Sequence, residues 1–415
     1  MAVITPFKAI RPSRDMASTI AALPYDVYNR KEAYDQVQKC PDSFLAIDRP
    51  ETQFAPDVDM YSDQVYEKAH DMLYAWLEEG RFIQDEKACY YVYELTMDGR
   101  SQTGIVACAS IDDYANGVIK KHENTRAEKE ADRIRHVDTC SAQTGPIFLA
   151  YKADSHIQGI VDKAKSVEPV YDFTAEDGIS HRCWIIEDLL DMALLANSFG
   201  AMDSIYIADG HHRAASAVKV GFKRRQEAID AGIAVTGAED YNFFLSVLFP
   251  DDQLKIYDYN RVLKDLGGMS PEELCTELES VVDVIKTSKE PIRPEKKGQW
   301  AMYLEGNWSL CQVKPELMSD DPVEGLDVSL LQNLVLEPLF GIADPKTDDR
   351  IDFVGGIRGL KELERRCATD CQVAFAMYPT SIEELFAVAD AGLLMPPKST
   401  WFEPKLRSGL FIHEI

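Results

Sequence analysis

One short stretch, residues 204–217, constrains the fold more than any other part of the sequence. Residues 204–208 are apolar and β-prone, which predicts a buried strand. Residues 214–218 are rich in small helix formers, which predicts the first turns of a packed helix. The five residues between them read Asp-Gly-His-His-Arg. The chain must therefore turn sharply from a strand into a helix at residues 209–213.

The chemistry of this turn suits a phosphate group. Gly210 lets the backbone turn sharply and approach a ligand closely. The start of the helix offers unpaired N–H groups and the positive end of the helix dipole. Arg213 adds a forked donor for phosphate oxygens, and Asp209 can hold a metal or take a proton. We also take His211 and His212 as candidate catalytic groups, and His212 as a phosphate ligand.

A purely structural interpretation of the turn stands beside this one. Asp209 could cap the helix, Arg213 could pair with a surface acid, and the two histidines could be core groups. We favour a binding site, because sites collect on loops that rigid elements hold in place.

Other polar residues are candidates for the same site. His122, Glu123 and Thr125 leave a short predicted strand together and could meet phosphate and metal, or simply form a solvated loop. Asp26 follows a proline-set extended segment and is a candidate acid or base, or a turn acid. Further candidate phosphate ligands are Arg133, Asn260, Arg261, Lys398 and Ser399.

Composition excludes some classes of partner. The chain has 44 basic and 70 acidic residues, a formal charge of −26, so we expect no binding to nucleic acid or to an anionic membrane surface. Nine cysteines without a CxxC pair indicate reduced thiols. No export signal or membrane-spanning stretch is visible, and we expect a cytoplasmic protein.

The pattern of apolar residues predicts a mixed α/β protein. We expect a hairpin around residues 97–100, an amphipathic helix over residues 61–79, a charged helix over residues 127–139 and a strand at residues 44–48. Asn260 and Arg261 are predicted to start a helix. The pattern of residue types changes after Gly267. We therefore predict two regions: residues 1–265, which contain the phosphate-binding turn, and residues 266–415, an α/β region that closes over the site.

Several stretches carry a family resemblance, and they span nearly the whole chain. Besides the turn, they are Pro24-Tyr25-Asp26-Val27, His122-Glu123-Asn124-Thr125, Asp132-Arg133, Gly145-Pro146-Ile147-Phe148, Met395-Pro396-Pro397-Lys398-Ser399-Thr400 and Phe402-Glu403-Pro404-Lys405. Together they resemble the bacterial family known as domain of unknown function 1015 (DUF1015). This resemblance implies a cytosolic bacterial protein and names no reaction.

The strand–turn–helix unit is also similar to the phosphate-binding turn of the ParB/sulfiredoxin superfamily. That similarity implies a ParB/sulfiredoxin-like core in which Gly210, His212 and Arg213 hold phosphate and Asp209 lies near metal or phosphate. His211 stands where sulfiredoxins have their catalytic cysteine, which argues against sulfinic-acid repair. The second arginine of the ParB turn is absent, which argues against a partition protein. The branch of the superfamily that contains free-serine kinases remains.

The leading hypothesis is therefore a phosphotransferase that acts on free serine or a similar small hydroxyl acceptor. The donor would be ATP, ADP or pyrophosphate, with Mg²⁺ or another divalent metal on Asp209 and Glu123, and with Glu123 or Asp26 as the base. Two alternatives stay open, a metal-dependent phosphohydrolase and a nucleotide-binding regulatory protein without turnover. The expected partner is a small phosphorylated molecule, and assembly into a homo-oligomer is left open.

Overall fold

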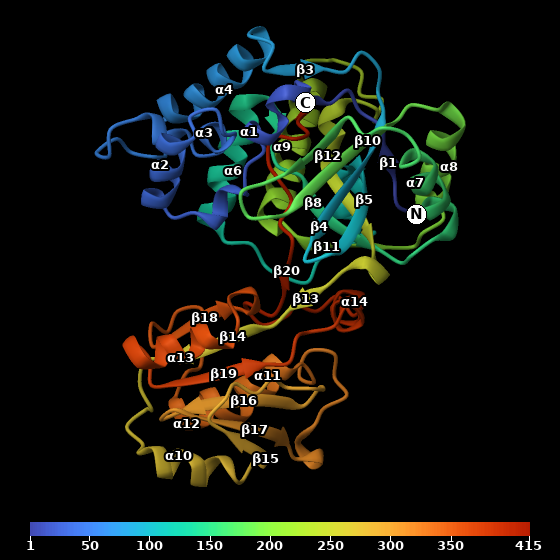
Figure 1. Cartoon of the computed structure of the whole chain (residues 1–415). Coiled ribbons are helices and arrows are strands. Elements are labelled where there is room, and N and C mark those ends of the chain that lie inside the picture. The colour runs from blue at the N-terminus through green and yellow to red at the C-terminus, as the bar shows by residue number, and fades with distance from the viewer. The chain divides into compact units, whose positions relative to one another are not determined.

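The computed structural model describes all 415 residues, and the chain divides into two compact units (Figure 1). Unit 1 contains residues 1–254 and 404–415, and unit 2 contains residues 255–403. The predicted boundary at residue 265 lies inside unit 2, because strand β14 (Tyr259–Leu263) pairs with two other strands of that unit. The predicted region 266–415 also includes a C-terminal segment of unit 1, where Ile412 pairs with Ile10.

Unit 1 is built on a mixed nine-stranded sheet. Eight of its strands follow the order β6-β11-β8-β12-β5-β4-β10-β9, and β1 pairs with β5. Most neighbours are antiparallel, but β6 is parallel to β11 and β12 is parallel to β8. The bounds are β1 Ile4–Thr5, β4 Tyr90–Met97, β5 Arg100–Ser110, β6 Ile119–Lys120, β8 Ile147–Tyr151, β9 Tyr171–Thr174, β10 Ser180–Ile186, β11 Ile205–Asp209 and β12 Phe243–Pro250.

Helices pack around this sheet. Beside the sheet they form an apolar cluster, called the second cluster here because the sheet has an apolar core of its own. Helices α2, α3 and α4 gather next to α6, and α6 packs against the long helix α9 (Figure 1). Phe44, Trp76 and Phe82 lie at the centre of the second cluster. The helices of unit 1 are α1 Ala17–Ile20, α2 Arg30–Lys39, α3 Leu45–Asp48, α4 Asp63–Glu78, α5 Ile111–Ala115, α6 Ala127–Cys140, α7 Ser155–Ala164, α8 Leu189–Gly200 and α9 His211–Asp230; the short strand pairs are β2 Ile10–Pro12 with β3 Phe82–Gln84 and β7 Ala142–Gln143 with β21 His413–Glu414.

Unit 2 has its own six-stranded antiparallel sheet, in the order β15-β17-β16-β19-β14-β18. A separate two-stranded sheet joins β13 and β20. The bounds are β13 Ile256–Tyr257, α10 Pro271–Leu278, β15 Val282–Ser288, β16 Gln299–Leu304, β17 Asn307–Val313, α11 Asp327–Leu331, α12 Glu337–Phe340, β18 Ile351–Gly355, α13 Leu360–Thr369, β19 Val373–Met377, α14 Ile382–Asp390 and β20 Trp401–Phe402.

The mixed α/β prediction is confirmed, and so are most of the predicted elements. The hairpin β4–β5 turns at Asp98 and Gly99, which both have positive φ, 52° and 77°, as a two-residue hairpin turn requires. The predicted helices over residues 61–79 and 127–139 correspond to α4 and α6. None of the helices combines the length and apolar character needed to cross a membrane.

Two element predictions are wrong. Residues 44–48 form helix α3 and not a strand, because a short apolar run that is buried on all sides carries no period that separates the two structures. Asn260 and Arg261 lie in strand β14 and do not start a helix. Strand β14 lies between two neighbouring strands and all five of its residues are buried, whereas the polar types of Asn260 and Arg261 had suggested a helix start.

The two units are expected to respond to acid in opposite directions. Burial lowers the pKa of His122 in unit 1 to about 4, so between pH 6.5 and 4 the unfolded chain binds a proton that the folded chain does not. Burial raises the pKa of Asp327 in unit 2 to about 7, so between pH 7 and 4 the folded chain holds a proton that the unfolded chain has lost. As pH falls through these windows, unit 1 loses and unit 2 gains up to roughly 1.4 kcal/mol of unfolding free energy per group and pH unit.

Urea unfolding at several pH values, followed by hydrogen exchange of peptides from each unit, measures both slopes. Asp327→Asn should remove the acid stabilisation of unit 2 and leave unit 1 unchanged. An unaltered slope for unit 2 in this variant would contradict the assignment to Asp327.

Two helical glycines should respond oppositely to alanine. A Cβ on Gly221 of α9 would lie 2.3 Å from the Tyr241 carbonyl oxygen and 2.9 Å from Ile111, whereas a Cβ on Gly159 of α7 meets nothing within 4 Å. Gly159→Ala should raise the free energy of unfolding by about 1 kcal/mol through helix propensity. Gly221→Ala should lower it by about 1–3 kcal/mol through overpacking. Chemical denaturation of both variants tests the contrast, and equal effects would refute it.

Candidate active site

The strand–turn–helix unit of the sequence is present as β11, Gly210 and α9 in unit 1. Gly210 has φ +93°, a conformation that residues with a side chain rarely adopt. No side chain caps the start of α9. The first N–H groups of a 20-residue helix are therefore open to a ligand at the end of a buried strand.

Parallel pairing of β6 with β11 brings His122 and Glu123 close to the turn that follows β11. β6 runs parallel to β11 with Ile119 opposite Ile205 and Lys120 opposite Tyr206, so the residues that follow both strands leave the same edge of the sheet. The rings of His122 and His211 meet edge to face with centroids 4.5 Å apart. Glu123 Oε2 lies 3.9 Å from His211 Nδ1.

Both of these histidines are buried and neutral. Burial lowers the pKa of His122 to about 4, although a hydrogen bond with the Ile207 backbone acts in the other direction. Burial and the neighbouring His122 hold the pKa of His211 well below its usual value. Nδ1 of His122 is enclosed and has no hydrogen-bond partner. As neutral groups, His122 and His211 can donate or accept a hydrogen bond, but they do not carry a charge.

His212 and Thr125 fix the loop that follows β6. The backbone N–H of Arg126 donates to His212 Nε2 at 2.9 Å, and Thr125 Oγ1 donates to Glu130 Oε2 at 2.6 Å. Burial lowers the pKa of His212, as do the charges of Lys129 and Arg126. Both residues therefore hold the loop through hydrogen bonds within the chain.

Arg213 folds back over the turn. A Cβ on Gly210 would lie 3.1–3.2 Å from its guanidinium group, a tight contact that would push the guanidinium away from the turn. Nη1 donates to the Pro146 carbonyl oxygen at 2.7 Å, at the entry to β8, and Nε is enclosed without a partner. Arg213 makes no hydrogen bond or close ion pair with a carboxylate, so its Nη2 group and the second N–H of Nη1 remain for an anion.

Asp209 is held by a lysine from the C-terminal segment of unit 1. Lys405 Nζ donates to Asp209 Oδ2 at 3.0 Å, and the Gly210 N–H donates to Oδ1 at 2.8 Å. Burial favours the neutral acid, but the charges of Lys405 and Arg213 outweigh it and hold the Asp209 pKa far below its usual range. Asp209 is thus a carboxylate that organises two cations around the turn.

This arrangement does not fit the predicted metal site on Asp209 and Glu123. Both oxygens of Asp209 already accept hydrogen bonds, one of them from an ammonium group that a divalent ion would have to displace. No group of three or more histidine, cysteine, aspartate or glutamate side chains is arranged to hold a metal ion. The donor set suits an anion better than a resident cation.

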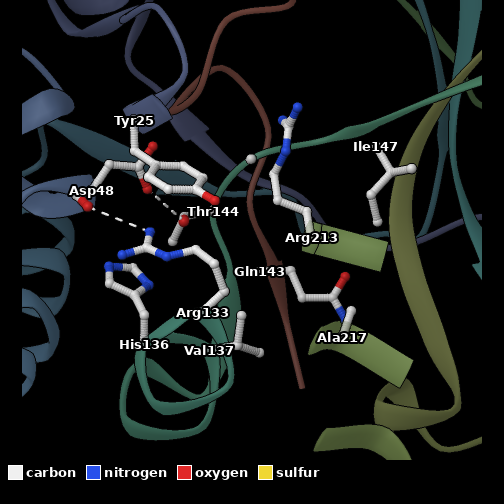
Figure 2. A pocket seen from close by; sticks show the side chains of 11 residues that line it. Tyr25, Asp48, Arg133, His136, Val137, Gln143, Thr144, Ile147, Arg213 and Ala217 are labelled. Carbon is white, nitrogen blue, oxygen red and sulfur yellow. Dashed lines mark hydrogen bonds between the residues drawn. The ribbon is translucent and has the colours of Figure 1, made fainter. Parts of the chain in front are cut away.

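Arg133 and Tyr25 form a wall next to the turn (Figure 2). The Arg133 guanidinium carbon lies 4.1 Å from the centre of the Tyr25 ring, and its Nε donates to Asp132 at 2.9 Å. Figure 2 shows Asp48 linked to both Arg133 and Thr144 by hydrogen bonds. A small cavity of about 30 Å³ between Arg133 and Arg213 has room for a water or two.

A larger pocket of about 200 Å³ shares Tyr25 and Arg133 with this cavity. Its lining combines tyrosines with charged groups: Tyr25, Tyr28, Tyr61, Tyr66, Asp26, Glu51, Asp132, Arg49, Lys129 and Arg133 are among them. Asp26 is exposed there, and its charge acts on His212. The pocket therefore contains the predicted acid–base residue Asp26, whose charge acts on His212 of the Asp209–Arg213 turn.

The remaining predicted ligands lie in unit 2. Asn260 is buried and bonds Asp258 and the Met377 backbone, while Arg261 is buried beside Phe353. Ser399 Oγ donates to the Pro396 carbonyl oxygen. Asn260 and Ser399 thus serve local structure.

Lys405, Tyr25 and Asp48 were not among the candidate site residues predicted from the sequence, although the loop that carries Lys405 was expected to fold back over the site. Lys405 and Tyr25 stand in stretches that carry the family resemblance, which was the available signal. Asp48 lies in the segment wrongly predicted as a strand, so its position beside Arg133 could not be foreseen.

The fold is that of a mixed α/β protein with a strand–turn–helix unit whose helix start and arginine suit an anion. Residues 4–329 match the family described as "Protein of unknown function (DUF1015)". The chain belongs to this family. No curated protein matches the chain.

Several solved structures resemble it distantly. A free serine kinase in complex with AMP is 17% identical with a TM-score of 0.35, over 74% of this chain and 92% of that chain. SbnI from Staphylococcus aureus is 11% identical with a TM-score of 0.38, over 73% and 85%. A conserved hypothetical protein from Pyrococcus furiosus is 17% identical with a TM-score of 0.35, over 74% and 94%. Likeness at this level carries no argument about function, and the similarity to the ParB/sulfiredoxin superfamily stays a prediction.

Lys405→Met tests the role of the Asp209 ion pair. The side chains are 19% and 33% exposed, so removal of the lysine should cost roughly 1–3 kcal/mol of unfolding free energy, between the values for surface and buried pairs. Asp209→Asn combined with Lys405→Met should cost less than the sum of the single changes. Lys31→Met, which breaks an exposed pair with Asp35, is the control and should cost under about 0.5 kcal/mol. Additive losses at Asp209 and Lys405 would show that the pair is not coupled.

Proposed function

We propose that this protein is a phosphotransferase that binds the phosphate of its donor at the Asp209–Arg213 turn. The observation that carries the proposal is the uncapped N-terminus of α9 together with the Arg213 guanidinium, which has no carboxylate partner. Backbone N–H groups, the helix dipole and a forked cation converge on one point, and this combination favours a phosphate.

Phosphoryl transfer depends mainly on position and charge neutralisation, and the turn supplies both. The N–H groups of α9 and the Arg213 guanidinium would hold the phosphate oxygens as charge builds on them. Lys405 and Asp209 would keep the turn in shape, because their ion pair fixes the carboxylate against the Gly210 N–H. Tyr25 and Arg133 would close one side of the site.

Asp26 is the stronger of the two candidate bases. Its side chain is exposed in the pocket of about 200 Å³ beside the turn, whereas Glu123 lies 3.9 Å from the buried His211. In the proposed step, Asp26 takes the proton of the acceptor hydroxyl as that oxygen bonds to phosphorus and the donor oxygen leaves. A small hydroxyl compound, free serine or a similar molecule, fits the size of the pocket as the acceptor.

The donor is a nucleotide or pyrophosphate in this proposal. A resident Mg²⁺ forms no part of it, since Lys405 occupies the carboxylate that would bind the ion. A divalent ion that arrives with the donor phosphates is compatible with the site, because Mg²⁺ usually keeps water and substrate oxygens as ligands.

Phosphate transfer by the purified protein tests the proposal. ATP, ADP and pyrophosphate are each offered with a pool of hydroxyl amino acids, with and without Mg²⁺, and the phosphorylated products are measured. Arg213→Ala should lower transfer by about 100-fold or more, as expected for loss of one group that stabilises the transition state. Asp26→Asn should lower the rate of transfer while donor binding, measured by calorimetry, stays intact.

Arg182→Ala and Asp172→Asn are matched controls, because this exposed pair lies on β10 and β9, several strands away from β11. Both should keep full activity. Donor hydrolysis that does not depend on an acceptor would favour a phosphohydrolase, and tight donor binding without turnover would favour a regulatory protein. Transfer that survives in Arg213→Ala would refute the assignment of the turn.

A further inference from the structure

Arg261 in unit 2 is a buried cation without an acidic partner. Only 3% of the residue is exposed, and it lies on β14 between Phe353 of β18 and Phe375 of β19. Its guanidinium carbon lies 5.3 Å from the centre of the Phe353 ring. Its one hydrogen bond runs from Nη1 to the Tyr259 carbonyl oxygen.

No acidic group in the chain offsets the free-energy cost of burying the Arg261 charge. A guanidinium group has five N–H donors and always carries a charge, so a buried one is normally paired with a carboxylate. Burial lowers the pKa of Arg261 to about 10, and no carboxylate is among the groups whose charge acts on it. Asp258 lies on the opposite face of β14, where it bonds Asn260 and Arg293. Glu403 accepts from the Trp401 indole.

A second cation lies on the same face of the strand. Residues two apart on a strand share a face, so Tyr259 is next to Arg261. The Lys398 ammonium lies 5.5 Å from the centre of the Tyr259 ring, and Trp401 meets that ring edge to face at 5.0 Å. The site therefore has two cations, Arg261 and Lys398, beside the rings of Phe353, Tyr259 and Trp401.

The backbone that presents Lys398 is strained and fixed. Lys398 has φ +58°, which is costly for a residue with a side chain and is common at ligand sites. Its neighbours hold this conformation, since Ser399 Oγ donates to the Pro396 carbonyl oxygen at 2.6 Å and Thr380 donates to the Ser399 carbonyl oxygen at 3.0 Å.

We propose that unit 2 binds a small oxyanion, a phosphate or a carboxylate group, between Arg261 and Lys398. The Nε and Nη2 atoms of Arg261 have no acceptor in the chain, so they are the donors that an anion would take up. A forked guanidinium group matches two oxygens of either anion. The site does not depend on the proposed phosphotransfer, because none of its residues belongs to the Asp209–Arg213 turn.

Hydrogen exchange of the full chain, with inorganic phosphate, pyrophosphate or acetate, tests this site. At least one anion should protect peptides that cover β14 and residues 395–402, and the three anions together separate a phosphate site from a carboxylate site. Arg261→Met should weaken that protection at least about tenfold in concentration, the value of a charge-assisted hydrogen bond. Arg365→Met removes an exposed arginine of the same unit and should leave it unchanged. Arg213→Ala should also leave it unchanged, which separates this site from the turn.

Arg261→Met should be as stable as the wild type, or more stable, in anion-free buffer, because an unpaired buried charge is removed. If this variant does not fold, Arg261→Lys decides, since it keeps the charge and loses the fork and should still weaken protection severalfold. Equal protection in the Arg261 variants and the wild type, or no protection of the wild type by any of the three anions, would overturn the proposal.

Discussion

The ion pair between Asp209 and Lys405 organises the candidate active site. It joins the end of β11 to the C-terminal segment of unit 1, two parts of the chain that are 196 residues apart. The Asp209 carboxylate also accepts the Gly210 N–H, so one acid fixes both the turn and the segment that covers it. Because it stays ionised between Lys405 and Arg213, it keeps two cations at the entrance to α9.

The sheet supplies the second constraint. β6 is parallel to β11, whereas β8 is antiparallel to it, so the residues that follow β6 and the start of β8 both lie beside the end of β11. His122 comes from the first, and the Pro146 carbonyl oxygen that holds Arg213 comes from the second. The register also shifts between Ile207 and Asp209, next to the site. Such irregularities re-aim side chains near active sites.

Much of this could be predicted from the sequence, for identifiable reasons. The strand–turn–helix unit was predictable because Gly210 and the small residues after it leave few conformations for residues 209–218. The hairpin at Asp98 and Gly99 was predictable for the same reason. His122 could be predicted as a site residue because it follows a short strand and has polar neighbours in the sequence.

The remainder depends on contacts that are distant in the sequence. Lys405 pairs with Asp209 only because the chain returns to unit 1 after residue 403. Arg261 was predicted near a helix start, but it is a buried strand residue opposite Phe353 and Phe375. The metal prediction for Asp209 did not foresee that an ammonium group would already occupy the carboxylate.

The most direct measurement is the response of the backbone amides at the start of α9 to a phosphate ligand. NMR spectra of protein with ¹⁵N-labelled histidine and arginine would be recorded during titration with pyrophosphate and ADP. The account predicts that the amide signals of His211, His212 and Arg213 shift together and saturate, and that Arg213→Ala weakens the response. Shifts elsewhere in the chain, with these three signals unchanged, would contradict a phosphate site at the turn.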